Sequence, residues 1–135
     1  MGLLLDSDVI IDHLNNKSDY LSSIVSISKD DLFMSIINWS EIMYGIKKSK
    51  NPIKASKQFT NFIIDLDIKI FEIDLKVADK FIDLKLDLER KGSRLEDFDL
   101  IIGSTAVINN LTLVTRNTNH FARIPEITIY PKTTS

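Results

Sequence analysis

The sequence predicts an α/β protein, a three-layer α/β/α sandwich with a mostly parallel sheet of four or five strands. Two observations carry this prediction. Apolar runs such as Leu3 to Leu5 show no polar alternation, which is typical of strands covered on both faces. Segments with helical spacing separate these runs, and strands that alternate with helices pair in parallel through right-handed crossovers.

The first strand and two helices are predicted before residue 30. Asp6 follows the run Leu3 to Leu5 and can cap a helix, and a second amphipathic segment covers about residues 19 to 27. The apolar positions of the first helix include Val9, Ile10 and Leu14. Residues 32 to 37 form another apolar run and predict the second strand.

Two more helices are predicted next. Asn38 resembles an N-cap, and Glu41 stands three residues later, where the acid of a capping box is found; this helix extends to about Lys48. Asn51 and Pro52 resemble the cap and the first residue of the following helix. Its apolar face carries Phe59, Phe62, Ile63 and Leu66.

The second half of the chain supplies three strands and two helices. Residues 69 to 73 predict the third strand, and a strongly periodic helix follows it and ends at Gly92. The apolar positions of that helix are Val77, Phe81, Leu84 and Leu88. Another helix begins at about Asp97, and residues 111 to 115 and 127 to 130 predict the last two strands.

Composition narrows the class of protein. The 135 residues suit one domain, expected over residues 1–131, with a flexible tail at 132–135. A net charge of −2 and a pI near 5.6 are not those of a basic nucleic-acid-binding domain. The absence of cysteine excludes disulfides and zinc thiolate sites and fits a reducing compartment. The N-terminus does not resemble a signal peptide and no apolar stretch can span a bilayer, so we expect a soluble, cytoplasmic protein.

One segment is locally basic. It holds five lysines within eleven residues and no acidic residue between them: Lys47, Lys48, Lys50, Lys54 and Lys57. A solvated helix end is the simpler interpretation, and a rim that contacts phosphate groups is the alternative. Trp39 and Tyr44 are predicted to pack in the core or between helices rather than to stack on bases.

Carboxylates stand where predicted strands end and helices begin. Asp6 follows the first strand, Glu41 follows the second, and Asp97 and Asp99 open a helix. Because the carboxyl ends of parallel strands share one edge of the sheet, these side chains are expected to meet there. Each acid taken alone also fits a helix cap or a favourable charge at a helix N-terminus.

A carboxylate cluster favours a bound cation. Two carboxylates about 4 Å apart repel by about 4 kcal/mol near a protein surface, and a divalent ion converts that repulsion into coordination. Because no histidine or cysteine is predicted in the cluster, Mg²⁺ or Mn²⁺ is favoured over zinc or copper. Asp6 and Asp99 would bind the metal, and Glu41 would hold or deprotonate a coordinated water that attacks a phosphodiester.

Polar residues beside the acids have auxiliary roles in this scheme. Asn117, two residues after the predicted strand end at Thr115, would position water or phosphate. Ser7 and Thr115 would supply hydroxyl groups beside it, and Asp97 is the alternative ligand to Asp99. His13 and His120 are predicted to have structural or surface roles. The chain has no glycine-rich phosphate loop, dinucleotide fingerprint or serine nucleophile elbow.

Four segments resemble, in order, the motifs of PIN-domain nucleases of the VapC toxin type. Residues 4–12, LLDSDVIID, are similar to the opening motif, in which a strand-ending Asp is followed by Ser or Thr and then by Asn or Asp. Residues 37–46, INWSEIMYGI, resemble the second motif, which is centred on Glu41. The third and fourth motifs resemble DFDLIIGSTA at residues 97–106 and LTLVTRNTNHF at residues 111–121.

The resemblance implies an Mg²⁺-dependent endoribonuclease that acts as the toxin of a type II toxin–antitoxin pair. Such proteins are usually dimeric, and a cognate antitoxin inhibits them by inserting a segment near the active site. The resemblance implies Asp6, Glu41 and Asp99 as the acidic triad, with Asn117 at the position of a more variable fourth member. Many relatives have an acid where this chain has Asn117 or His120.

Two alternatives stay open at this point. In a non-catalytic PIN-like binding module, the acids would only cap helices or grip a basic peptide or RNA. An aspartyl-phosphate receiver also places acids at the carboxyl edge of a sheet, but it needs a lysine after a late strand, where this chain has Arg116 and Asn117. Binding of Mg²⁺ or Mn²⁺ distinguishes the nuclease from the binding module.

Overall fold

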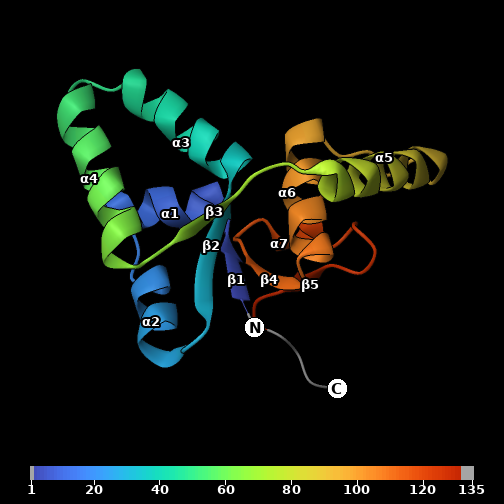
Figure 1. Ribbon diagram of the computed structural model, residues 1–135, viewed down its shortest axis with the longest axis horizontal. Coiled ribbons are helices and arrows are strands. Elements are labelled where there is room, and N and C mark those ends of the chain that lie inside the picture. Colours follow the sequence, from blue (N-terminus) through green and yellow to red (C-terminus); the bar gives the residue numbers. More distant parts are fainter. Residues whose placement is uncertain (1, 132–135) are drawn as a thin grey trace.

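The computed structural model describes residues 2–131, which form one five-stranded sheet between two layers of helices (Figure 1). All strand pairs are parallel, and the strand order is β3-β2-β1-β4-β5. The strands are β1 Gly2–Leu5, β2 Asp31–Ser35, β3 Lys69–Phe71, β4 Leu111–Val114 and β5 Thr128–Ile129. The predicted fold class is therefore confirmed, and the predicted tail at 132–135 lies outside the described residues.

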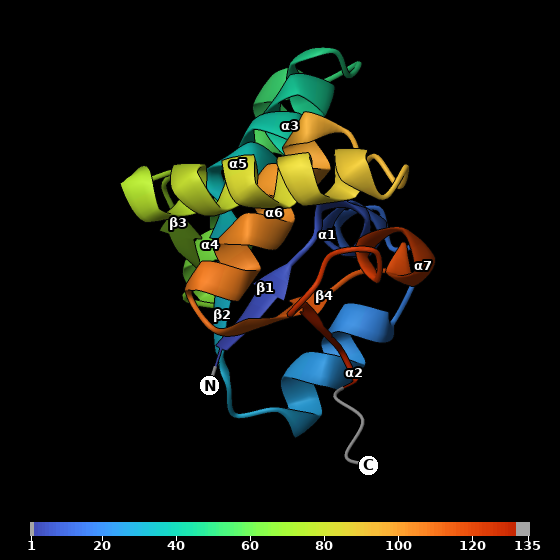
Figure 2. The ribbon, with the colours of Figure 1, turned by 90° about the vertical axis from the view of Figure 1, so that its right-hand side faces the viewer.

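Helices cover both faces of the sheet. In Figure 1, α1, α2 and α4 lie on one side of the strands and α5 and α6 lie on the other. Figure 2, turned by 90°, shows α5 and α6 in front of the sheet. The helices among the described residues are α1 Ser7–Leu14, α2 Tyr20–Ile27, α3 Ile36–Lys47, α4 Pro52–Asp65, α5 Leu75–Arg90, α6 Asp97–Ile108 and α7 Thr118–Phe121.

The continuous apolar run of β1 supplies both halves of the core, because successive side chains of a strand point to opposite faces. Leu3 and Leu5 pack with residues of α1, α2 and α4, and Leu4 packs with residues of α5 and α6. Each of these three leucines is at most 3% exposed. The central strand is therefore buried on both faces, as its lack of alternation predicts.

The start of α3 differs from the prediction. The second strand ends at Ser35, so Ile36 and Ile37 belong to the helix rather than to the strand. Ser35 is the N-cap, and Asn38 is the third helical residue whose side chain completes the capping box. The apolar run hides this boundary, because two isoleucines fit a buried helix as well as a strand. Glu41 is consequently free of any capping role.

Other helix ends follow their sequence signals. Asn51 accepts from the Lys54 N–H and Pro52 is the first residue of α4, as predicted. Gly92 has a φ of +67° after the end of α5, a backbone conformation that glycine adopts without strain. The short α7 was not predicted, because its four residues fall below the length at which helical spacing is visible.

Parallel register brings the ends of the strands to one edge of the sheet. Leu5 pairs with Val114, and Ser35 pairs with Phe71. The residues that follow these positions start α1 and α3 and the loop before α7. The chain thus places its candidate site along this carboxyl edge. No helix among residues 2–131 is long and apolar enough to cross a membrane.

Candidate active site

Asp6 is the most buried acid of the candidate site, with 8% of its surface exposed. It follows β1 directly and accepts from the Ser7 N–H at 2.9 Å as the N-cap of α1. The Thr115 hydroxyl, just beyond β4, donates to Oδ2 at 2.7 Å. Asn38, on α3, donates through Nδ2 to Oδ1 at 3.1 Å. Three separate segments therefore fix the position of this carboxylate.

The ionised form of Asp6 is disfavoured in the folded protein. Burial raises the pKa of Asp6 to about 6, although the hydrogen bonds from the Thr115 hydroxyl and the Ser7 N–H lower it. The negative charges of Asp8 and Asp99 raise it further. A buried carboxylate with like charges nearby is disfavoured in its ionised form, and a nearby cation would reverse that balance.

Asn38 is fully buried and forms hydrogen bonds with Ser35, Asp6 and Ser7. Its Oδ1 accepts from the Ser35 hydroxyl at 2.7 Å and from the Ser35 N–H at 3.2 Å. Because its carbonyl oxygen is occupied, its amide hydrogens face the site, where they reach Asp6 and the Ser7 hydroxyl at 2.9 Å. The sequence analysis interpreted Asn38 only as an N-cap. The signal in the sequence is its spacing of three residues from Ser35, which is that of a capping box with Asn in place of the usual Glu or Gln.

Glu41 lies one turn further along α3 and is half-buried. The Ser7 hydroxyl, which was predicted to lie beside Asn117, donates to Oε1 of Glu41 at 2.8 Å and holds this carboxylate. Burial raises the pKa of Glu41, the hydrogen bond from Ser7 lowers it, and the charge of Asp99 raises it. Asp6 and Glu41 are thus linked through Ser7 and Asn38.

Asp99 lies in the first turn of α6, where its charge acts on Asp6 and Glu41. Its Oδ2 is 2.7 Å from Nε2 of His120, which belongs to α7. Both side chains are partly buried, with 28% of Asp99 and 23% of His120 exposed. The sequence analysis gave His120 a structural or surface role, and this contact instead brings it to the acidic edge. The unpredicted helix α7 explains the difference, because it determines the direction of the imidazole.

The structure separates Asp97 from Asp99. Asp97 is 55% exposed and its Oδ1 lies 2.9 Å from Nζ of Lys85 on α5. It therefore faces away from the other acids.

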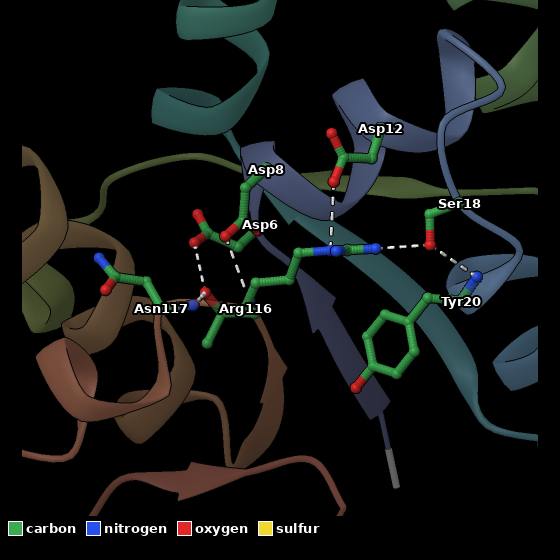
Figure 3. Close-up of polar contacts among 8 residues, drawn as sticks. Asp6, Asp8, Asp12, Ser18, Tyr20, Arg116 and Asn117 are labelled. Atoms are coloured by element: carbon green, nitrogen blue, oxygen red, sulfur yellow. Dashed lines mark hydrogen bonds and ion pairs between the residues drawn. The ribbon is translucent and has the colours of Figure 1, made fainter.

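Asn117, the fourth predicted residue, donates its backbone N–H to the Thr115 hydroxyl at 3.0 Å. Its side chain makes no hydrogen bond within residues 2–131 and points away from Asp6 in Figure 3.

Beside the acids, Arg116 joins the loop after β4 to α1 and to the start of α2 (Figure 3). Its N–H donates to Oδ2 of Asp8 at 3.2 Å, and its Nε lies 3.2 Å from Oδ2 of Asp12. The guanidinium also donates to the Ser18 hydroxyl and lies 5.7 Å from the centre of the Tyr20 ring. Oδ1 of Asp8 is buried without a hydrogen-bond partner among the described residues. The sequence analysis assigned Arg116 no such role.

The predicted residues are therefore brought to one edge, but they do not form a finished metal site. The charge of Asp99 acts on both Asp6 and Glu41, which requires that the three acids lie near one another. Among the residues that the structure describes, no group of three or more histidine, aspartate or glutamate side chains is arranged to hold a metal ion. Glu41 and Asp99 are engaged with Ser7 and His120 instead. Their role as metal ligands stays a prediction.

Comparison with known protein families identifies the family of this chain. The family model of the PIN domain matches residues 3–127. The chain belongs to the PIN domain family. The match begins at Leu3 within β1 and ends before β5, and it includes every acid of the candidate site.

Relatives of this PIN domain cover nearly its whole length. Ribonuclease VapC2 of Rickettsia felis is 30% identical over 129 residues, which is 94% of this chain and 95% of the relative. The tRNA(fMet)-specific endonuclease VapC of Salmonella typhimurium is 28% identical over 129 residues and covers 96% of both chains.

Solved structures agree with the fold of this PIN domain. VapBC2 from Rickettsia felis, bound to a DNA fragment from its promoter, matches with a TM-score of 0.85 and 27% identity. That match covers 96% of this chain and 97% of the other. DNA-bound VapBC from Salmonella typhimurium matches with a TM-score of 0.87 at 27% identity and covers 96% of each chain.

Proposed function

We propose that this PIN domain is a metal-dependent endoribonuclease and the toxin of a toxin–antitoxin pair. The observation that carries the proposal is the set of three carboxylates at the carboxyl edge of the sheet, with Asp6 held by three hydrogen-bond donors. Relatives that match the chain over nearly its full length are named VapC ribonucleases or endonucleases. The acid cluster and the names of the relatives support the same reaction, hydrolysis of an RNA phosphodiester.

The donor set at this edge fits a hard divalent cation, Mg²⁺ or Mn²⁺. The acids offer oxygen ligands, and burial, together with smaller contributions from neighbouring negative charges, raises the pKa of Asp6 and of Glu41. A bound ion would supply an acidified water and would stabilise charge on the phosphate. Asp6 and Asp99 would bind the ion, and Glu41 would hold or deprotonate the attacking water. Thr115 and Asn38 keep Asp6 in place by hydrogen bonds to its two oxygens.

Cleavage of RNA by variants of the chain tests the proposal. Asp6→Asn and Asp99→Asn proteins are compared with the wild type on a labelled RNA, in Mg²⁺ and in EDTA. Asp97→Asn is the matched control, because Asp97 lies two residues from Asp99 and pairs outward with Lys85. We expect cleavage that needs the metal, is lost in the first two variants and is kept in the control.

Two results would contradict the proposed reaction. Equal cleavage in EDTA and Mg²⁺ would exclude a metal-dependent mechanism. Full activity of folded Asp6→Asn and Asp99→Asn proteins would exclude these carboxylates from it. A folded wild-type protein that takes up neither Mg²⁺ nor Mn²⁺ in calorimetry would favour a non-catalytic binding module.

We also propose a cognate antitoxin and a homodimer as partners. The two solved structures described above are VapBC complexes bound to DNA. Exposed apolar side chains on α5 and at the start of α6 favour an interface, with Leu75 at 87% and Phe98 at 55% exposed. Sedimentation of the chain alone and with the protein encoded beside it tests both partners. A chain that stays monomeric in both samples would contradict them.

A further inference from the structure

One face of α3 carries a row of three residues that starts at the candidate site. Glu41, Tyr44 and Lys48 are spaced by three and four residues, which places them on the same side of a helix. Lys48, the C-cap residue, lies about 10 Å from Glu41 along the axis, at about 1.5 Å per residue. Other residues of α3, Ile42 and Ile46 among them, border the hollow beside α1 and α4. The row therefore runs outward along a separate face.

Tyr44 is the unexpected member of this row. The sequence analysis predicted that it packs in the core or between helices, and that prediction is wrong, because 67% of its surface is exposed. Its ring lies 4.9 Å from Nζ of Lys48, a cation–π distance. An exposed aromatic ring with a cation over one face leaves the other face for a base and places a positive charge beside it for the adjoining phosphate.

The row ends in a strongly basic tip. Figure 1 shows α3 rising from the sheet to its junction with α4. No acidic residue occurs between Glu41 and Asp65, although the whole chain has a net charge of −2. Within residues 2–131, the five lysines of this segment are exposed and none forms an ion pair: Lys47, Lys48, Lys50, Lys54 and Lys57. Their charge is therefore available to a ligand.

We propose that α3 is the track along which single-stranded RNA reaches the candidate site. One base stacks on Tyr44, the adjoining phosphate contacts Lys48, and the strand continues over the lysines at the junction of α3 and α4. This inference rests on the proposed ribonuclease function and names the form of its substrate. Stacking on an aromatic ring is available only to an unpaired base, so the track selects single-stranded segments over duplexes.

Binding without cleavage tests the track. A fluorescein-labelled single-stranded oligoribonucleotide of mixed sequence is titrated with the full chain in EDTA, and fluorescence anisotropy is read. Tyr44→Ala removes the ring, whereas Tyr44→Phe keeps it and serves as the matched control. Lys48→Ala removes one phosphate contact, and Lys76→Ala removes an exposed lysine on α5 instead. Circular dichroism verifies that each variant is folded.

We expect Tyr44→Ala to weaken binding about tenfold, with Tyr44→Phe and Lys76→Ala within twofold of the wild type. Lys48→Ala should reduce the slope of log K against log salt concentration by about 0.7, the value for one phosphate of a single strand. Wild-type protein should bind a duplex of the same sequence more weakly. Equal binding by Tyr44→Ala and wild type, or the absence of any binding by the wild type, would overturn the inference.

Cleavage assays separate this inference from the proposed function. If the wild type binds through Tyr44 but cuts no RNA with Mg²⁺ or Mn²⁺, the nuclease proposal fails and the track stands. If the wild type cuts RNA and Tyr44→Ala cuts and binds equally well, the track fails and the nuclease proposal stands.

Discussion

Asn38 donates from Nδ2 to Oδ1 of Asp6 at 3.1 Å, so the cap of α3 and the end of β1 are joined inside the candidate site. The opposite end of the same amide accepts from Ser35, which leaves the side chain only one orientation that satisfies both partners. A capping interaction thereby determines where a functional carboxylate stands. The side chain of Asn38 therefore contributes both to the stability of the fold and to the position of Asp6.

Asn38→Ala should lower the free energy of unfolding by about 2–3 kcal/mol, because it removes the capping box and leaves buried Ser35 and Asp6 with fewer partners. Urea unfolding measures the change. Asn109→Ala is the control, since it removes a single partly buried hydrogen bond to the Thr105 carbonyl and should cost about 1 kcal/mol. Equal losses in the two variants would show that the link to Asp6 has no special energetic weight.

The raised pKa of Asp6 predicts the direction of a pH effect. The carboxyl ionises near 3.8 in the unfolded chain and near 6 in the folded one. Between these values the folded chain binds more protons, so the stability contributed by this group falls as pH rises through that window. A difference of about two pKa units corresponds to an upper limit of about 3 kcal/mol.

Asp6→Asn should therefore stabilise the metal-free protein at neutral pH. Since the amide disturbs the hydrogen bond with Thr115 at any pH, we expect a net gain of about 1–2 kcal/mol at about pH 7.5 and a net loss of about 1 kcal/mol at about pH 4. Urea unfolding in EDTA at a series of pH values measures the difference from the wild type. A difference that stays constant over this range would contradict the assignment of the effect to the ionised carboxylate.

Metal should reverse the instability that Asp6 causes. An ion that binds only the folded chain stabilises it, by about 2.7 kcal/mol at one hundred times its dissociation constant. We expect Mg²⁺ or Mn²⁺ to raise the melting temperature of the wild type and of Asp97→Asn, and to leave Asp6→Asn and Asp99→Asn unchanged. Thermal unfolding with and without EDTA measures these shifts. A similar rise in all four proteins would assign the metal to another part of the surface.

The sequence predicted the fold from signals that do not depend on contacts between distant residues. The unalternating run Leu3 to Leu5 and the Asn51–Pro52 start of α4 are local features, and the structure agrees with both. The second strand was extended too far because Ile36 and Ile37 continue its apolar run, although the boundary depends on the contact between Ser35 and Asn38.

Sheet topology was enough to predict where the acids of the candidate site lie, but not the directions of their side chains. Parallel strands place Asp6, Glu41 and Asp99 at one edge whatever their side-chain angles, and the structure agrees. The direction of each side chain depends on local contacts. Asp97 pairs with Lys85 away from the other acids, and His120, on α7, contacts Asp99. The exposure of Tyr44 was missed for the same reason, because helical spacing does not say which faces of α3 its neighbours cover.

Replacement by alanine of two glycines that lie within helices should change the free energy of unfolding in opposite directions. At Gly45, on α3, an added Cβ would meet no atom within 4 Å, whereas at Gly103, on α6, it would lie 2.3 Å from Cδ1 of Ile124. Ile124 is only 2% exposed, so its side chain has little room to move. The absence of a side chain at Gly103 thus allows α6 to pack closely against Ile124.

Gly45→Ala should raise the free energy of unfolding by about 0.5–1 kcal/mol, because alanine lowers the conformational entropy of the unfolded chain and favours the helix. Gly103→Ala gains the same helical preference but forces a buried isoleucine to shift, so we expect a net loss of about 1–2 kcal/mol. Urea unfolding of the two variants beside the wild type measures both changes, with each protein serving as the control for the other. A gain in both variants would mean that Ile124 repacks freely and that close approach does not require glycine at position 103.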